Sequence, residues 1–405
     1  MGAGGSNMGA GSSNLKTFFI VTEKELVGID FKQLLLQPEW TTTQVPNVAP
    51  IRVTINLLNL FGGKSIVGMK HVALDSNVFL LGGEFLESGA IPTKGYVSNH
   101  PESYLGSSNQ VLQLSCEKNT FRLKRTTRMK KFLYGKCCPM VENIKGKIYV
   151  LEDKPYLQNH HLNGPFEVYD QDREYSRPLS NPPPYARYPQ GKIEGHVVLG
   201  DKFVVFEKRS NGEIDGYFYD THRAGEWERL DPYIVFLFAQ GCLLPLPINA
   251  MCVPFFPKLK RLGIELVLSR KGIEEGYAML INASSSMLLF YQPLVEFRRH
   301  FPLMETGERA HLNNGRNFFF VLPNNQICAI WIAFDHHKML RLFVTIFTLE
   351  FCFDPTTMPS NRSSSSSPPT EKKFLKVSNI HTWDSVVRKD GASSNHIFDA
   401  FFHRK

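Results

Sequence analysis

Short apolar runs that follow tight polar turns recur along the chain. Each run has four consecutive apolar or aromatic residues, and the turn before it contains Gly, Asp, Asn or Ser. A polar turn between two apolar segments predicts an antiparallel hairpin, and an unbroken apolar run predicts a second strand that is buried on both faces. The second strands predicted in this way are Asn77–Leu81, Lys147–Leu151, Lys202–Phe206 and Gln326–Ile330.

A second pattern follows each hairpin at a variable distance. It is a strand that ends in an aromatic or aliphatic residue and often Asp, followed by a polar turn and another aromatic residue. The clearest copies are Tyr217–Trp227, Phe166–Asp170 with Tyr175, and Leu26–Asp30 with Trp40; Val111–Leu114 with Phe121 and Leu288–Tyr291 with Phe297 are looser copies. The two patterns together give four strands over about 50–70 residues, a period typical of a propeller blade.

The residues that carry this period resemble the kelch repeat. Gly82-Gly83 matches the glycine doublet of that family, Tyr219-Asp220 with Trp227 matches the second half of its repeat, and Tyr169-Asp170 matches it in part. Where other copies would have the doublet, the chain has Glu152-Asp153 and Glu207-Lys208. The chain is most similar to divergent kelch-type propellers of plants, many of which carry an F-box, although no F-box-like segment precedes the first strand. WD40 repeats are a weaker match.

The fold expected is therefore all-β, a β-propeller of six kelch-like blades. Six outer hairpins are predicted near Asp30, Leu114, Asp170, Asp220, Tyr291 and Phe353, and seven blades are the alternative because the first interval is long. Residues 1–15 are expected to be a disordered Gly/Ser-rich tail, residues 16–405 one propeller, and residues 355–372 an exposed Ser/Pro-rich loop. Residues 46–70 and 88–109 are interpreted as insertions. The segment His396–Phe402 has strand composition and is predicted to close the ring beside the first strands.

Composition narrows the class of protein. The 405 residues are 42% hydrophobic and include 31 Phe and 14 Tyr, which is enough apolar content for a large core and excludes a wholly disordered chain. The uncharged stretch Tyr233–Phe256 contains three prolines in its second half, which favours short buried strands over a spanning helix. The seven scattered cysteines form no C-x-x-C pair, and no signal peptide is evident, so we expect reduced cysteines in a cytoplasmic or nuclear protein.

The N-terminus fits the pattern for N-myristoylation at Gly2. A flexible Gly/Ser-rich tail would match the same pattern by composition alone. Membrane contact is expected only if Gly2 is acylated, and one acyl chain binds membranes marginally.

One stretch of the chain is strongly basic. Arg122, Lys124, Arg125, Arg128, Lys130 and Lys131 fall within ten positions, where an outer strand leads into the next blade. Such a stretch could bind an acidic peptide or phosphates, or it could be a strand edge protected by charge. Aromatic residues interleave it only sparsely, so nucleic acid is not expected.

No motif predicts catalysis. His160-His161 and His336-His337 are more typical of exposed loops than of a metal site. The alternative function is a metal-dependent propeller enzyme, either a galactose-oxidase-like copper radical oxidase or a specifier-like protein whose iron motif Glu-x-x-x-Asp-x-x-x-Cys does not occur here. We therefore expect a monomeric, non-catalytic protein-interaction module with no metal or cofactor. By resemblance, it could recognise substrates for ubiquitin ligation through an adaptor.

Overall fold

A computed structural model describes the strands of the chain and several of their connections. The residues described are 15–39, 46–74, 77–86, 104–107, 110–117, 120–125, 135–136, 139–152, 166–170, 175–179, 192–208, 214–223, 226–230, 248–253, 264–271, 275–282, 287–294, 316–322, 326–334, 339–351, 375–388 and 397–404. Between residues 248 and 294 the description covers the backbone alone. Gly2, Arg128, Lys130, Lys131, both histidine pairs and residues 355–372 lie outside the described residues.

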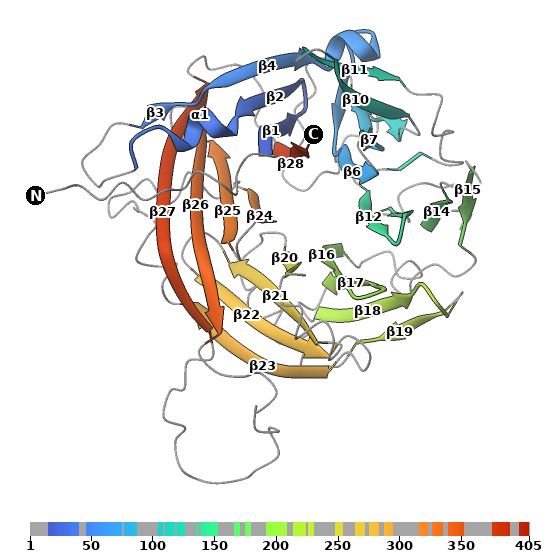
Figure 1. The fold of residues 1–405 in the computed structure, drawn as a ribbon. Coiled ribbons are helices and arrows are strands. Elements are labelled where there is room, and N and C mark those ends of the chain that lie inside the picture. Colours follow the sequence, from blue (N-terminus) through green and yellow to red (C-terminus); the bar gives the residue numbers. More distant parts are fainter. Residues whose placement is uncertain are drawn as a thin grey trace, which may run out of the picture.

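Mainly antiparallel sheets surround a common centre, and in each four-stranded unit the strands run in order from the centre outwards (Figure 1). The first sheet has the order β28 (Ile397–Arg404), β1 (Leu15–Thr22), β2 (Glu25–Asp30) and β4 (Ile51–Asn56). The second contains β6 (Lys70–Leu74), β7 (Asn77–Leu81), β10 (Val111–Glu117) and β11 (Thr120–Arg125). The third contains β12 (Met140–Ile144), β13 (Lys147–Leu151), β14 (Phe166–Asp170) and β15 (Tyr175–Pro178).

The next sheet has eight strands. One half is β16 (Lys192–Leu199), β17 (Lys202–Lys208), β18 (Ile214–Asp220) and β19 (Trp227–Arg229), and the other half is β20 (Ile248–Val253), β21 (Ile264–Lys271), β22 (Glu275–Asn282) and β23 (Met287–Leu294). The last large sheet contains β24 (Arg316–Val321), β25 (Gln326–Phe334), β26 (Leu340–Phe351), β27 (Leu375–Arg388) and β3 (Asn47–Val48). A small sheet joins β5 (Ser65–Val67), β8 (Glu84–Leu86) and β9 (Tyr104–Ser107).

The number of propeller sheets differs from the prediction. Five sheets of four or more strands are present among the described residues, not six or seven separate blades. The difference arises at β16 and β20, whose backbones pair in parallel through Gly195 with Ile248 and His196 with Asn249. This pairing joins two consecutive four-stranded meanders into one sheet. The all-β propeller class is confirmed, and α1 (Phe31–Leu35) and the 3-10 helix η1 (Leu58–Phe61) are the helical segments described.

The hairpins predicted around the tight polar turns are present in the structure. β12 and β13 pair with Ile144 opposite Lys147, so the turn between them has two residues. Lys145 and Gly146 both have positive φ, at 52° and 78°, as a type I′ turn requires. The equivalent pairs β6–β7, β16–β17 and β24–β25 are also present.

The glycine doublet has a steric role at the end of β7. Gly82 and Gly83 have φ of 72° and 95°, and a Cβ on Gly82 would lie 2.5 Å from the Pro139 side chain. At the matching ends of β13 and β17 the chain has Glu152 and Glu207, which are both buried. These copies therefore depart from the kelch pattern by placing a buried carboxylate where the pattern has glycine.

The C-terminal strand lies in the first sheet. β28 pairs antiparallel with β1 from Thr22–Ile397 to Leu15–Arg404. Its side chains contribute to two cores: Ile397, Ala400 and Phe402 pack against the last sheet, and Phe401 packs towards the second sheet. That this strand holds the ring closed stays a prediction, which a truncation would test.

The segments interpreted as insertions contribute to the sheets. Residues 46–70 contain β4, the outer strand of the first sheet, so that interpretation is wrong for this part. β4 follows β2 after a long connection that includes α1 and β3, which is why the sequence period did not place it. Of residues 88–109, the structure describes β9, which pairs with β8.

Within the described residues, no helix is long and apolar enough to cross a membrane. Of the uncharged stretch Tyr233–Phe256, the structure describes only β20. Cys116 and Cys328 are free thiols, and complete burial raises the pKa of the Cys328 thiol above its usual range.

Candidate interaction site

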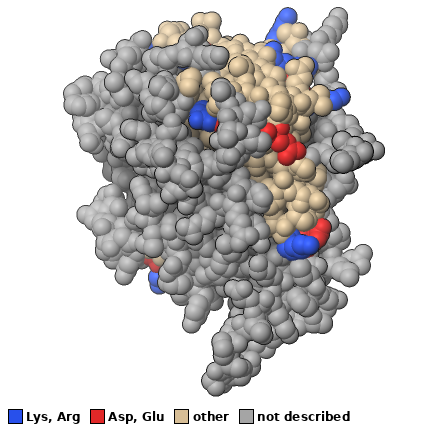
Figure 2. Space-filling model, turned by 90° about the vertical axis from the view of Figure 1, so that its left-hand side faces the viewer, with Lys and Arg blue, Asp and Glu red and all other residues tan. Residues whose placement is uncertain are grey.

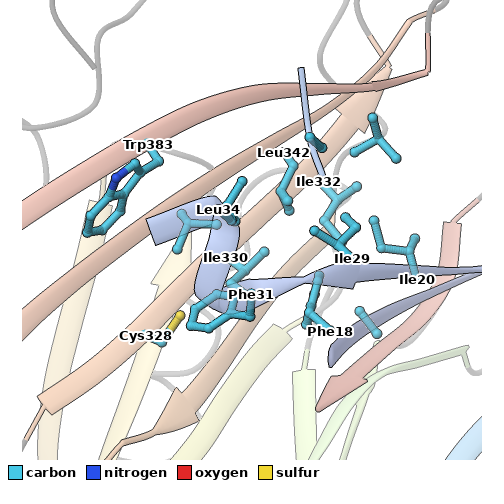
Figure 3. Packing of buried hydrophobic residues seen from close by; sticks show 14 of the residues in the cluster. Phe18, Ile20, Ile29, Phe31, Leu34, Cys328, Ile330, Ile332, Leu342 and Trp383 are labelled. Atoms are coloured by element: carbon cyan, nitrogen blue, oxygen red, sulfur yellow. The ribbon is translucent and has the colours of Figure 1, made fainter. Parts of the chain in front are cut away.

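The connection between β2 and β4 crosses from the first sheet to the last. It begins with α1, whose N-terminus is capped because the Asp30 carboxylate accepts a hydrogen bond of 3.0 Å from the Gln33 N–H. Phe31 and Leu34 point into the core beside Ile330 and Cys328 (Figure 3). The Phe31 ring meets Phe402 of β28 edge to face at 4.7 Å. The helix is therefore fixed by its buried face, and its other face is exposed.

Gln37 ties this connection to the last sheet. Its side-chain amide donates to the Val48 carbonyl at 2.7 Å and accepts from the Ser385 hydroxyl at 3.1 Å. Its backbone carbonyl accepts from the Trp383 indole N–H at 3.2 Å. A main-chain hydrogen bond of 2.8 Å from Ala49 to Val386 continues the attachment along β27. The segments around Gln37 and Ala49 are therefore both hydrogen-bonded to β27.

Three large apolar side chains are exposed on this connection and at the start of β4. Leu36 is 77% exposed, Val48 56% and Ile51 47%, and they are the exposed large hydrophobic residues in the part of the chain that the structure describes. We call them the strap patch. Figure 2 views the molecule from this side, and the described surface there is mostly uncharged, with isolated Lys, Arg, Asp and Glu side chains. Single exposed apolar residues are ordinary, but several on one chain segment indicate a candidate binding surface.

The basic stretch lies partly on β11, the outermost strand of the second sheet. Arg122 is exposed, and its carbonyl accepts a hydrogen bond of 3.3 Å from the Ser115 hydroxyl. Lys124 and Arg125 continue the same strand, and Phe121 and Leu123 are buried beneath it. Arg128, Lys130 and Lys131 lie outside the described residues. Binding of an acidic partner by this stretch stays a prediction.

Lys136 is a charged residue whose position sequence reasoning missed. It is completely buried and forms an ion pair with Glu167, whose other oxygen accepts from the Ser176 hydroxyl at 2.6 Å. Burial lowers the pKa of the Lys136 ammonium, while Glu167 and Glu152 oppose that shift. Its carbonyl also accepts from Gly83 N–H at 2.8 Å. Glu167 within an otherwise apolar strand was the available signal for a buried partner.

Polar side chains bridge neighbouring inner strands near the centre of the ring. Asp399 of β28 accepts from the His71 ring at 2.7 Å and from its backbone N–H at 2.6 Å. Asn143 of β12 donates to the Ala73 carbonyl of β6 at 2.9 Å, and Glu142 lies 3.1 Å from His196 of β16. Burial alone would raise the pKa of Asp399, but His71 and Lys70 outweigh it and hold that pKa at about 2.

These bridges join sheets to one another. Among the described residues, no group of three or more His, Cys, Asp or Glu side chains is arranged to hold a metal ion. The pairs His71–Asp399, Asn143–Ala73 and Glu142–His196 each connect strands of two neighbouring sheets.

Two tryptophans, Trp227 and Trp383, differ in how deeply they are buried. Trp227, which marks the second half of the repeat in the sequence, packs between neighbouring sheets at the rim of an aromatic cluster, 5.3 Å from Phe166 of the third sheet, and is partly exposed. Trp383 of β27 is 2% exposed. Gln37 and Leu34 of the β2–β4 connection contact Trp383, and this long-range contact could not be inferred from the repeat.

Comparisons with known proteins add structural neighbours. No family model and no curated protein matches the sequence. Similar solved structures include one described as YjhT, with TM-score 0.42 and 11% identity over 90% of this chain and 97% of the other. A protein of unknown function from Dyadobacter fermentans has TM-score 0.35 and 10% identity over 92% and 96% of the two chains. AofleA from Arthrobotrys oligospora has TM-score 0.39 and 8% identity over 94% and 92%.

Proposed function

We propose that this propeller is a non-catalytic protein-interaction module that binds a protein partner through the strap patch. The observation that carries the proposal is that Leu36, Val48 and Ile51 are exposed on and directly after a connection held against the last sheet. The described parts of the connection, residues 31–39 and 46–50, are held by these hydrogen bonds. Segments held in this way lose little conformational entropy when a partner binds, so their exposed apolar area contributes more fully to affinity.

Narrower versions of this proposal follow from the resemblance. We propose a kelch-type lineage because Gly82 and Gly83 occupy positions that require glycine, as the family doublet does. Recognition of substrates for ubiquitin ligation through an adaptor, in the cytoplasm or nucleus, is one role that such a module would fill. The basic stretch from Arg122 to Lys131 is a second candidate surface, suited to an acidic partner.

Quantitative affinity capture from native extract tests the proposal. The bait is the full chain, compared with a Leu36→Asp/Val48→Asp variant and with Arg223→Glu, which alters a side chain that is 79% exposed in the β18–β19 turn. We expect a partner recovered in near-stoichiometric amount with the wild type and Arg223→Glu, and lost with the double variant. Equal recovery with all three baits contradicts the strap patch as the site.

Metal analysis of the same purified chain tests the non-catalytic part. Stoichiometric copper or iron would favour the metal-dependent propeller enzyme instead. We expect the folded chain to contain neither metal in stoichiometric amount.

A further inference from the structure

Every propeller sheet ends in an outer strand, and an outer strand can pair with a strand of another chain unless something prevents it. Most of these edges carry a protective feature. β11 has Arg122, Lys124 and Arg125; β15 has four residues with Arg177 and Pro178; β19 has three residues with Glu228 and Arg229; β23 contains Pro293. Charge, shortness and proline each discourage added pairing.

The edge of the last sheet is protected by a different feature. β3 pairs in parallel with β27 at Ser385 and Val386, and Glu39 lies 2.8 Å from His381 further along the same strand. Asn379 has φ of 49°, next to an irregularity in the β26–β27 register. β3, Glu39 and this irregularity together occupy or interrupt the edge at Ser385–Val386, His381 and Asn379.

β4 differs from all of these strands. Its six residues, Ile51–Asn56, contain no proline and a single charge, Arg52. That charge is engaged within the fold, since the Arg52 guanidinium donates to the Thr17 hydroxyl at 3.1 Å and lies 5.3 Å from the centre of the Phe121 ring. Among the described residues no strand lies on the outer side of β4. The pairing of β4 with β2 has one register irregularity, between Val53 and Ile51. The regular part of the edge, Val53–Asn56, contains no proline and no charge, so it can template a short strand.

The backbone of β4 presents hydrogen-bonding groups outwards at known positions. The Leu57 N–H donates to the Lys24 carbonyl at 2.7 Å, so residue 57 faces β2. In an antiparallel ladder the facing residues alternate, so Ile55 and Val53, opposite Leu26 and Gly28, also face β2. Thr54 and Asn56 then direct their N–H and C=O groups away from the sheet, and both residues are exposed.

This edge is continuous with the strap patch. Ile51 begins β4, and Val48 precedes it by three residues and is tied to Leu36 through Gln37. A strand added beside Thr54 would extend towards these apolar side chains. The formal net charge of +8 opposes pairing of two copies of the chain and favours a neutral or acidic segment.

We propose that the partner contributes an extended segment that adds as a strand to β4 and places apolar side chains, at alternate positions, on Leu36, Val48 and Ile51. Backbone hydrogen bonds to Thr54 and Asn56 supply the register, and the strap patch supplies the preference for apolar residues. The proposal rests on the function proposed above and names its surface and the class of its ligand: an apolar, neutral or acidic extended peptide from another protein.

Selection of peptides on the full chain tests this assignment. A displayed library of random dodecapeptides is selected on the wild-type chain, and the enriched peptide is synthesised and its dissociation constant measured by fluorescence anisotropy. The matched variants are Thr54→Pro, which removes the outward N–H, and Thr54→Val, which keeps it. We expect Thr54→Pro to weaken binding at least tenfold and Thr54→Val to leave it within twofold. Because the Thr54 N–H faces away from β2, proline there should leave the melting temperature nearly unchanged.

A second measurement covers the case in which Thr54→Pro does not fold. N-methylation of the peptide at successive positions should weaken binding to the wild type at every second residue, as strand pairing requires. Three results would overturn the assignment: no enriched peptide, equal binding to Thr54→Pro, or self-association of the wild-type chain that Thr54→Pro abolishes. These results do not test the proposal that the strap patch binds a protein partner. That proposal is tested separately, by protein capture with the Leu36→Asp/Val48→Asp variant.

Discussion

Two junctions between neighbouring sheets are built in different ways. Between the third sheet and β16–β19, the core is made by the repeat itself, with Phe166 and Tyr219 meeting edge to face at 5.1 Å. Between the last and first sheets, the core also takes in α1 and β28, which come from distant parts of the sequence. The first junction could recur at any position of the ring, whereas the second exists once, where the two ends of the chain meet.

The difference locates the surface available to a partner. At the repeat-built junction, aromatic side chains of the two sheets face one another. At the junction of the chain ends, the connection that buries Phe31 and Leu34 must also return to β4, and that return carries Leu36, Val48 and Ile51 at the surface. The candidate site is thus a consequence of how the first sheet is completed.

Removal of the C-terminal strand is expected to have the largest effect. Deleting residues 396–405 removes Ile397, Phe401 and Phe402 from two cores, a loss of about 5–9 kcal/mol at about 1.5–3 kcal/mol for each large side chain. A domain is stable by about 5–15 kcal/mol, so we expect the ring to unfold or to melt far lower by calorimetry. Deleting residues 1–14 is the control and should change little. An unchanged melting temperature after the C-terminal deletion would show that β28 does not hold the ring closed.

Alanine substitutions of Trp383 and Trp227 compare the contributions of the two junctions to stability. Trp383→Ala should destabilise the protein by about 3–5 kcal/mol, because it empties a fully buried site. Trp227→Ala should cost about 1–3 kcal/mol, since that ring is already partly exposed. Urea unfolding of both variants provides the comparison. A larger effect at Trp227 would indicate that the repeat-built junction dominates the stability.

Acid should weaken the contact between β28 and β6. The folded-state pKa of Asp399, about 2, lies below its ordinary value of 3.8. Its ionised form therefore stabilises the fold above the unfolded pKa, by about 2–3 kcal/mol, and this contribution disappears as pH falls through the folded pKa. About half should be lost by pH 3, so the stability difference between wild type and Asp399→Asn should shrink between pH 6 and pH 3. A difference that stays constant with pH would contradict the ion pair with His71 and Lys70.

The smallest effect on stability is expected at the basic stretch. Reversing Arg125, Arg128 and Lys130 to Glu should leave the melting temperature nearly unchanged, because exposed ion pairs contribute about 0–1 kcal/mol. If this stretch binds an acidic partner, the same variant should lose partner capture, and wild-type capture should weaken with salt. Normal capture by the variant would remove the stretch as a partner site and leave the strap patch as the surface to pursue.

The sequence predicted the strands whose formation depends on residues close to one another in the chain. Apolar runs after tight turns located β7, β13, β17 and β25, and the strand composition of the tail predicted β28. The eight-stranded sheet, the burial of Trp383 and the role of Lys136 depend on contacts between segments far apart in the chain, which periodicity does not encode. In the sequence, Lys136 could not be distinguished from lysines such as Lys145 and Lys147, which are exposed, without knowledge of its partner Glu167.

The candidate site shows the same limit. Arg122 and its basic neighbours were found because charge is visible in sequence, whereas Leu36, Val48 and Ile51 look like ordinary core residues. Their exposure follows from a connection that spans two sheets. β4 was assigned to an insertion for the same reason, since α1 and β3 separate it from its partner β2.

Amide hydrogen exchange along β4 tests the central claim most directly. In the free chain, Val53 and Ile55 should exchange slowly because they face β2, and Thr54 and Asn56 should exchange rapidly. Addition of the selected peptide should protect Thr54 and Asn56 and leave a control strand such as β15 unchanged. Protection that appears elsewhere in the ring while Thr54 and Asn56 stay rapidly exchanging would contradict docking on this edge.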